Sequence, residues 1–254
     1  MKKNISDRRS FIKKTALGTM AAISIPEILI AAAPKKGGKK IQLLKDYKIL
    51  FQGDSITDSG RNKEDISGFN NARVLGNGYV FLAAAALLRK YAPLNLKIFN
   101  KGISGNKVFQ LAERWDKDCL DIKPDVLSIL IGVNDIWHKL NGQYDGTVDV
   151  YRRDYIALLE RTKNALPDVQ LIICEPFGVR GVKAVGDKWY PEFLEYQKTA
   201  RDIAIQFGAV FIPYQSIYDE AQKQAPGEYW TGDGVHPSLA GAELMAEAWM
   251  NVIK

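Results

Sequence analysis

Strand-length apolar stretches alternate with helical patterns along most of this chain, and this alternation restricts the fold more than any other feature. The expected strands cover residues 47–51, 96–100, 126–131, 169–174 and 210–212. The expected helices cover residues 79–90, 108–119, 150–165, 191–207 and 238–253, the last with Ser238 as its N-cap. Strands separated by helices form a parallel sheet with helices on both faces. We therefore predict an α/β fold, a three-layer α/β/α sandwich with a five-stranded parallel sheet in flavodoxin-like order.

A single domain accounts for this pattern. The chain has 254 residues, of which 46% are hydrophobic and 25% charged, and this is enough for one sizeable core. Neither an internal repeat nor a second domain is visible. We place the domain at residues 45–254.

The first 33 residues have the layout of an export leader. Paired arginines lie in a basic segment, and an apolar stretch and three alanines follow. The arginine pair favours the twin-arginine type. The alternative is a membrane anchor, but the stretch is shorter than the roughly 20 residues of a span and contains Pro26 and Glu27. We predict a signal peptide over 1–33, cleaved near Ala33, and an exported periplasmic or extracellular protein without stable membrane insertion after cleavage.

Most of the positive charge lies ahead of the domain. The net charge of the chain is +6. Residues 1–33 contribute +4 and the four lysines of residues 34–44 another +4, so the remaining residues carry about −2. We expect residues 34–44 to be a flexible lead-in. A nucleic-acid-binding protein keeps its basic patch on the folded domain, so we expect no nucleic-acid partner. The sequence leaves the oligomeric state open, a homo-oligomer included.

The two cysteines, Cys119 and Cys174, are expected to be free. An exported protein can form a disulfide, which remains the alternative. However, Cys174 lies in a predicted strand and Cys119 late in a predicted helix. Two buried thiols are the simpler outcome.

Ser55 is the candidate nucleophile. It lies in FQGDSITDSG, directly past the first predicted strand, at the end of a parallel sheet where sites form. A serine hydroxyl needs a base to take its proton, and the chain contains only His138 and His236. Asp233 lies three residues before His236, close enough to orient the imidazole and stabilise its charged form. The alternative is that Asp233 and His236 belong to an ordinary surface turn.

Three donors could stabilise a negatively charged oxygen beside Ser55. They are the backbone N–H of Gly105 in NKGISGN, the side-chain amide of Asn134 in GVND, and the N–H of Ser55 itself. Glycine and asparagine after a strand are often only turn residues. The ordered combination of Ser, Gly, Asn and Asp-x-x-His at four strand ends favours an active site.

Together these motifs resemble the SGNH, or GDSL-type, hydrolase family. The matching segments are GDSIT (53–57), NKGISG (100–105), GVND (132–135) and DGVHP (233–237), in the family's order. The resemblance spans residues 47–253 and implies the SGNH hydrolase fold. It implies a catalytic triad of Ser55, Asp233 and His236, and an oxyanion hole of Ser55, Gly105 and Asn134.

Longer segments are similar to the acetylxylan-esterase branch of that family. They are GDSITDSGR, GNGYV, NKGISGNKV, KPDVLSILIGVNDIW and HPSLAGAELMA. This resemblance implies a serine esterase that removes O-acetyl groups from plant polysaccharides or their oligosaccharides, with an acetylated carbohydrate as its partner. Three alternatives stay open: a lysophospholipase or thioesterase, a pectin or sialic acid deacetylase, and a non-catalytic carbohydrate-binding protein of the same fold.

Aromatic residues near the motifs are candidate sugar contacts, because sugars stack on aromatic rings. Trp137 follows the motif of Asn134, Tyr190 lies after the fourth strand, and Trp230 precedes the Asp233 loop. The alternative is that each ring packs at the edge of the core. The histidines and cysteines match no zinc-ligand spacing, and no nucleotide-binding loop motif is complete, so we expect neither metal nor organic cofactor.

Overall fold

The computed structural model describes residues 39–65 and 68–254. The predicted signal peptide and residues 34–38 of the predicted lead-in lie outside the described residues. The end of that lead-in is part of the domain, because Ile41 is buried and forms a parallel bridge with Ile253. Its N–H donates to the carbonyl of Val252 over 2.9 Å. Ile41 therefore packs with the domain, although it precedes the predicted boundary at residue 45.

The centre of the domain is a five-stranded parallel sheet, as the sequence predicted. The strands are β1 (Lys48–Gly53), β2 (Lys97–Asn100), β3 (Val126–Leu130), β4 (Gln170–Cys174) and β5 (Val210–Ile212). Their order is β2-β1-β3-β4-β5, the flavodoxin-like order. Every residue of β3 is buried, since both faces of the sheet are covered, and this explains its nearly continuous apolar sequence.

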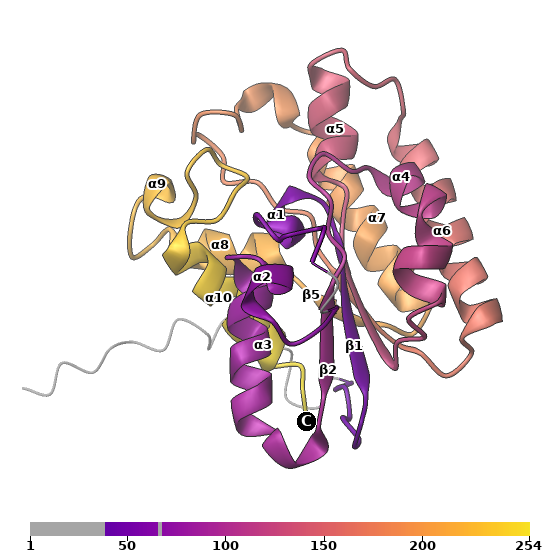
Figure 1. The fold of residues 1–254 in the computed structure, drawn as a ribbon. Coiled ribbons are helices and arrows are strands. Elements are labelled where there is room, and N and C mark those ends of the chain that lie inside the picture. The colour runs from indigo at the N-terminus through magenta and orange to yellow at the C-terminus, as the bar shows by residue number, and fades with distance from the viewer. Residues whose placement is uncertain (1–38, 66–67) are drawn as a thin grey trace, which may run out of the picture.

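Helices cover both faces of the sheet, which gives three layers (Figure 1). One layer contains α3 (Tyr79–Lys90), α8 (Tyr214–Ala221) and α10 (Leu239–Met250). The other contains α4 (Val108–Glu113), α6 (Val148–Ala165) and α7 (Glu192–Gln206). The remaining helices are α1 (Ser55–Asp58), α2 (Ala72–Leu75), α5 (Val133–Leu140) and α9 (Gly227–Trp230), with the short η2 (Ala92–Leu94), η3 (Asp116–Leu120) and η4 (Asp187–Trp189).

Several helical segments differ from the sequence prediction, among them α8, and two of them follow β2 and β3. The helix expected over 108–119 ends at Glu113, and a turn of π-helix, η3, follows it. Helix α5 begins within GVNDIW, where the sequence pattern predicts only a turn after a strand. Gly132, with φ of 125°, makes that turn alone, and the helix begins at the next residue. Asn134 therefore lies in the first turn of a helix.

Helix α10 begins where the sequence predicted. The Ser238 side chain accepts a hydrogen bond from the N–H of Gly241 at 3.2 Å, and this makes Ser238 the N-cap. The helix packs on α3, and Trp249 near its end lies against Phe51 of β1 with 4.8 Å between ring centroids. The Trp249 ring N–H donates to the buried hydroxyl of Ser128 over 3.0 Å. This packing fixes the segment that leads into α10 relative to the sheet.

Both cysteines are free and buried, as predicted. Burial raises the pKa of Cys119 to about 12 and that of Cys174 to about 12. Neither thiol is therefore ionised near neutral pH.

The strand order sets the position of the site. The chain runs from β1 to β2 on one side and then returns to place β3 on the other side of β1. Such a reversal leaves a crevice at the carboxyl ends of the strands. The segments that follow β1, β2 and β3 meet there, and they contain Ser55, Gly105 and Asn134.

Candidate active site

Ser55 is the first residue of α1, directly after β1. Gly53 ends the strand where a Cβ atom would lie 2.3 Å from the carbonyl oxygen of Leu130, so a larger residue has no room there. The Asp54 side chain accepts a hydrogen bond from the N–H of Ile56 at 3.0 Å and caps the short helix. These contacts hold Ser55 half-buried at the end of the sheet.

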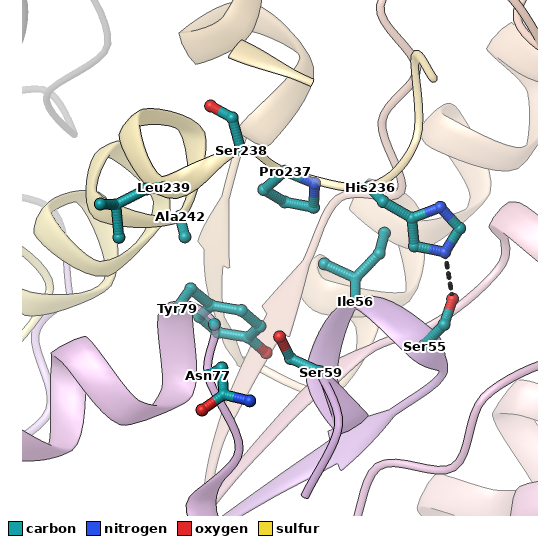
Figure 2. Close-up of a pocket in the computed structure, with 11 residues that line it drawn as sticks. Ser55, Ile56, Ser59, Asn77, Tyr79, His236, Pro237, Ser238, Leu239 and Ala242 are labelled. Carbon is teal, nitrogen blue, oxygen red and sulfur yellow. Dashed lines mark hydrogen bonds between the residues drawn. The ribbon is translucent and has the colours of Figure 1, made fainter. Parts of the chain in front are cut away.

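The Ser55 hydroxyl faces His236. Ser55 Oγ and His236 Nε2 are 2.8 Å apart, and Figure 2 shows the hydroxyl directed at the ring nitrogen. On the other side of the ring, His236 Nδ1 lies 2.7 Å from Asp233 Oδ2. This chain of serine, imidazole and carboxylate can move a proton from the hydroxyl to the ring.

Asp233 is held in its charged form. Partial burial alone would raise its pKa, but hydrogen bonds from the backbone N–H and the ring of His236 and from the N–H of Val235 hold the pKa below its usual range. The two N–H groups lie 2.8 and 2.9 Å from Asp233 Oδ1. The carboxylate is therefore fixed by its own loop and is able to stabilise a protonated imidazole.

The loop that contains Asp233 is braced from the side. The N–H of Ala184 donates to the carbonyl of Asp233 over 3.0 Å, and the N–H of Val179 donates to the carbonyl of Gly234 over 2.8 Å. A Cβ atom at Gly234 would lie 2.6 Å from the carbonyl of Val182. The segment after β4 therefore packs tightly against the loop and limits its movement.

The Gly105 loop is tied to α1. Asp58 Oδ2 accepts hydrogen bonds of 2.9 Å from both the N–H and the hydroxyl of Ser104. A Cβ atom at Gly102 would lie 2.4 Å from the backbone nitrogen of Asp58. The Arg61 guanidinium donates to the carbonyl of Gly102 over 2.8 Å. Asp58 and Arg61 are buried and therefore join the Gly105 loop to the Ser55 helix.

Three hydrogen-bond donors are available at this junction. Among the described residues, neither the N–H of Ser55 nor the N–H of Gly105 has a hydrogen-bond partner. Gly105 has a φ of 81°, which favours glycine. The Asn134 amide donates one hydrogen to the carbonyl of Asn106 over 3.3 Å, which places it against the same loop and leaves its second hydrogen available.

The predicted sugar-stacking residues lie in different surroundings. Trp137 is half-buried, with its ring centroid 6.2 Å from that of His236. Tyr190 is half-buried, and the Arg180 guanidinium carbon lies over its ring, 4.8 Å from the ring centroid. Trp230 is buried, and its ring N–H donates to the carbonyl of Ala225 over 3.1 Å. It therefore packs at the edge of the core. Of these three, Trp137 lies beside the triad.

A cavity of about 230 Å³ opens next to Ser55 and His236. We name it the α3–α10 pocket, and its walls come from segments 55–59, 77–79 and 236–242 (Figure 2). No sequence pattern distinguishes Ser59, Asn77 or Leu239, which line it. Their position depends on which loops meet in space.

His138 lies away from the proton-transfer chain. Its Nδ1 atom is 3.1 Å from the Lys107 ammonium, and burial together with that charge lowers its pKa. Lys107 in turn lies over the rings of Phe109 and Tyr144. This agrees with the choice of His236 as the base.

Comparisons with known proteins give the chain's relatives. A model of the GDSL-like lipase/acylhydrolase family matches residues 51–244. An acetylxylan esterase from Geobacillus stearothermophilus is 34% identical over 210 residues, which cover 81% of this chain and 93% of the esterase.

Solved structures agree. A GDSL-like lipase from Parabacteroides merdae is 52% identical, with a TM-score of 0.82, and the match covers 84% of this chain and 98% of the lipase. The structure of the Geobacillus esterase matches with a TM-score of 0.75 at 31% identity, over 84% of this chain and 96% of the esterase. Variants of that esterase in which a serine, an aspartate or a histidine is replaced by alanine are described as catalytic mutants.

Two kinds of feature are absent from the described residues. None of the helices there has the length and apolar character that crossing a membrane requires. Within the same ranges, histidine, cysteine, aspartate and glutamate side chains form no cluster of three or more that could hold a metal ion.

Proposed function

Because this chain belongs to the GDSL-like lipase/acylhydrolase family, we propose that it is a serine esterase that removes O-acetyl groups from an acetylated carbohydrate. The family and the acetylxylan esterase relative support a carboxylic ester hydrolase. That relative also supports plant polysaccharides, or oligosaccharides derived from them, as the source of the ester.

The hydrogen-bonded chain from Ser55 through His236 to Asp233 is the observation that carries this proposal. His236 Nε2 takes the hydroxyl proton while Ser55 Oγ attacks the acetyl carbonyl carbon. Asp233 Oδ2 holds the ring in the required tautomer and stabilises the imidazolium. The aspartate and histidine of the described catalytic mutants are also three positions apart, which supports the same roles here.

The oxyanion that forms during attack needs donors that are already in place. The N–H groups of Ser55 and Gly105 and the amide of Asn134 supply them, since each has a hydrogen without a partner among the described residues. His236 then gives its proton to the oxygen of the leaving sugar. A water molecule repeats the two steps on the acetyl-enzyme, releases acetate and restores the Ser55 hydroxyl. No step calls for a metal or an organic cofactor.

The size of the cavity beside the triad favours a small substrate group. A volume of 230 Å³ is below the roughly 300–1,000 Å³ of pockets that enclose drug-sized ligands. The enclosed space is therefore that of one small group, and the acetylxylan esterase relative supports a short acyl chain in the ester. We expect activity to fall steeply from acetate to longer esters, in contrast to a lysophospholipase or thioesterase.

The N-terminal sequence adds a location to the proposal. A twin-arginine leader over 1–33 would export the enzyme to the periplasm or the cell exterior, where polysaccharide fragments occur. Mass analysis of the enzyme recovered from its native cells would test this, because export with cleavage predicts a new N-terminus near residue 34. A full-length protein in the cytoplasm would contradict it.

Replacing the nucleophile tests the proposed function. Ser55→Ala removes the attacking oxygen, and we expect kcat on 4-nitrophenyl acetate and on acetylated xylan to fall by about 10⁴-fold or more. Ser216→Ala, a change on the exposed side of α8, is the matched control and should keep wild-type activity. Turnover by Ser55→Ala close to that of wild type would refute the assignment.

Labelling by a serine-reactive phosphonate separates an enzyme from a carbohydrate-binding protein of the same fold. An active esterase should form an adduct at Ser55, and the adduct should be absent from Ser55→Ala. Tight carbohydrate binding without any adduct would favour the non-catalytic alternative.

A further inference from the structure

Ser59 has a backbone conformation that normally favours glycine. It is the C-cap of α1, and its φ of 41° and ψ of 46° place it in the left-handed region. Its N–H closes the helix by donating to the carbonyl of Ser55 over 2.9 Å. The Ser59 hydroxyl has no hydrogen-bond partner among the described residues and lines the α3–α10 pocket. A serine in a backbone conformation that favours glycine points to a use for its hydroxyl.

Asn77 is fixed next to Ser59. Its N–H donates to the carbonyl of Ser59 over 2.9 Å. The glycines on either side pack against the end of α1, since a Cβ atom at Gly76 would lie 2.5 Å from the carbonyl of Asp58, and one at Gly78 2.6 Å from the Ser59 hydroxyl. Within the described residues the Asn77 side chain makes no hydrogen bond, and it is exposed at the pocket. Two unused polar groups are thus held together on one wall.

The opposite wall of the pocket is largely apolar, and the hydroxyl of Ser238 in it is already hydrogen-bonded to Tyr229 and Gly241. Tyr79 and Ala242 form its floor between the two helices, and Leu239 stands at its mouth with 76% of its surface exposed. His236 closes the end beside Ser55 (Figure 2). A pocket with one polar wall and one apolar wall matches a sugar ring, which has hydroxyl groups at its edge and C–H groups on its faces.

We propose that the α3–α10 pocket is the subsite for the sugar ring that carries the acetyl ester, with Ser59 and Asn77 hydrogen-bonding to its free hydroxyl groups. This inference rests on the proposed function, because it assigns a position to the alcohol part of the same substrate. It makes Ser59 and Asn77 specificity-determining residues, and Leu239 a contact for the apolar face of the ring.

The alcohol part fits this pocket better than the acyl part does. An acetyl methyl group accepts and donates no hydrogen bond, so it would leave both polar groups unused. The volume is that of about seven to eight waters, more than an acetyl group fills and close to one sugar ring. His236, which must protonate the leaving sugar oxygen, lines the pocket, whereas Gly105 and Asn134, which face the acyl oxygen, do not.

Two variants test the subsite. Ser59→Gly removes the hydroxyl and relieves the left-handed backbone, so the protein should fold at least as well as wild type. Asn77→Ala removes the exposed amide. For each variant, kcat/KM is measured on two esters. Mono-acetylated methyl β-xylopyranoside has a leaving group with further free hydroxyls, and 4-nitrophenyl acetate has a leaving group without them.

Lys123→Gly is the matched control. Lys123 also has a positive φ, of 53°, but it lies just before β3 at the opposite end of the sheet, with an exposed side chain. We expect Ser59→Gly and Asn77→Ala each to lower kcat/KM on the xyloside by roughly three- to tenfold relative to 4-nitrophenyl acetate, the loss of one hydrogen bond. The control should leave that ratio at the wild-type value.

The outcomes separate this subsite from the proposed function. An unchanged substrate ratio in both variants overturns the subsite while leaving the esterase assignment intact. A shift in preference between 4-nitrophenyl acetate and butyrate, with the sugar ratio unchanged, makes the pocket an acyl site and also overturns the inference. A wild-type protein that hydrolyses none of these esters would overturn the proposed function itself.

Discussion

The carboxyl of Asp54, beside the nucleophile, makes the stability of this protein depend on pH. It is fully buried, and its second oxygen, Oδ2, has no hydrogen-bond partner among the described residues. Burial raises its pKa from 3.8 to about 7; the hydrogen bond from the Ile56 N–H opposes the rise, and the nearby Asp135 carboxyl adds to it. The folded protein therefore keeps a proton at Asp54 that the unfolded chain has lost.

The size of the effect follows from the two pKa values. Below about pH 4 the carboxyl is protonated in both states and contributes no pH dependence. As pH rises towards 7, the unfolded chain ionises first and the folded state becomes less favourable by about 1.4 kcal/mol for each pH unit. Over the interval from 3.8 to about 7 this amounts to about 4 kcal/mol, and the loss is complete above about pH 8.

Asp54→Asn tests this reasoning, because asparagine keeps the oxygen that accepts from Ile56 and cannot ionise. The free energy of unfolding is measured with urea at pH 4.5, 6 and 8 for wild type and variant. We expect the free energy of unfolding of the variant to rise relative to that of wild type by about 3 kcal/mol between pH 4.5 and pH 8, since about 1 kcal/mol of the effect is already present at pH 4.5. A difference that stays constant with pH would show that Asp54 is ionised in the fold and would refute the argument.

Asp233→Asn provides a control of opposite sign. The hydrogen bonds from His236 and Val235 hold the pKa of Asp233 below its usual range, so its stabilising effect is present above the pKa of the unfolded carboxyl and is lost as pH falls. The variant should be less stable than wild type near neutral pH, and that gap should close in acid. The two substitutions therefore change the pH dependence of the free energy of unfolding in opposite directions.

Two further predictions concern the oxyanion donor and the thiols. Asn134→Ala should lower kcat on 4-nitrophenyl acetate by about 10²- to 10³-fold with the fold retained, and an unchanged kcat would remove Asn134 from the oxyanion hole. Cys119 and Cys174, buried with pKa values of about 12, should not react with a thiol reagent in the native protein and should yield two thiols in urea. Fewer than two thiols in urea would indicate a disulfide.

The sheet could be predicted because the sequence pattern of each strand matches the buried position that the strand has in the fold. Each strand is a short apolar run that ends in glycine and small polar residues, and buried parallel strands require this pattern. The proposed triad could be predicted from the sequence for a similar reason. The chain has two histidines, and only His236 has an aspartate three residues before it. There were therefore few candidates for the base that takes the serine proton.

Helix α5 could not be predicted, because its sequence has the features of a turn. Glycine and asparagine after an apolar strand usually mark a loop, and the eight residues of α5 give too short a window for a helical period. The consequence is functional, because residues three and four apart share a helix face. Asn134, Trp137 and His138 therefore point from one face towards the Asn106 carbonyl, the His236 ring and the Gly105 loop.

The α3–α10 pocket shows where sequence patterns cease to be informative. Its walls come from residues 55–59, 77–79 and 236–242, and each segment by itself looks like a strand end, a helix entry or an N-cap. Only the packing of α3 on α10 brings them together, and that packing depends on side chains distributed over both helices. The proposed catalytic residues lie in short sequence motifs, whereas the positions of Ser59 and Asn77 depend on this contact. Substrate preference can therefore change through the second group while the chemistry of Ser55 and His236 stays the same.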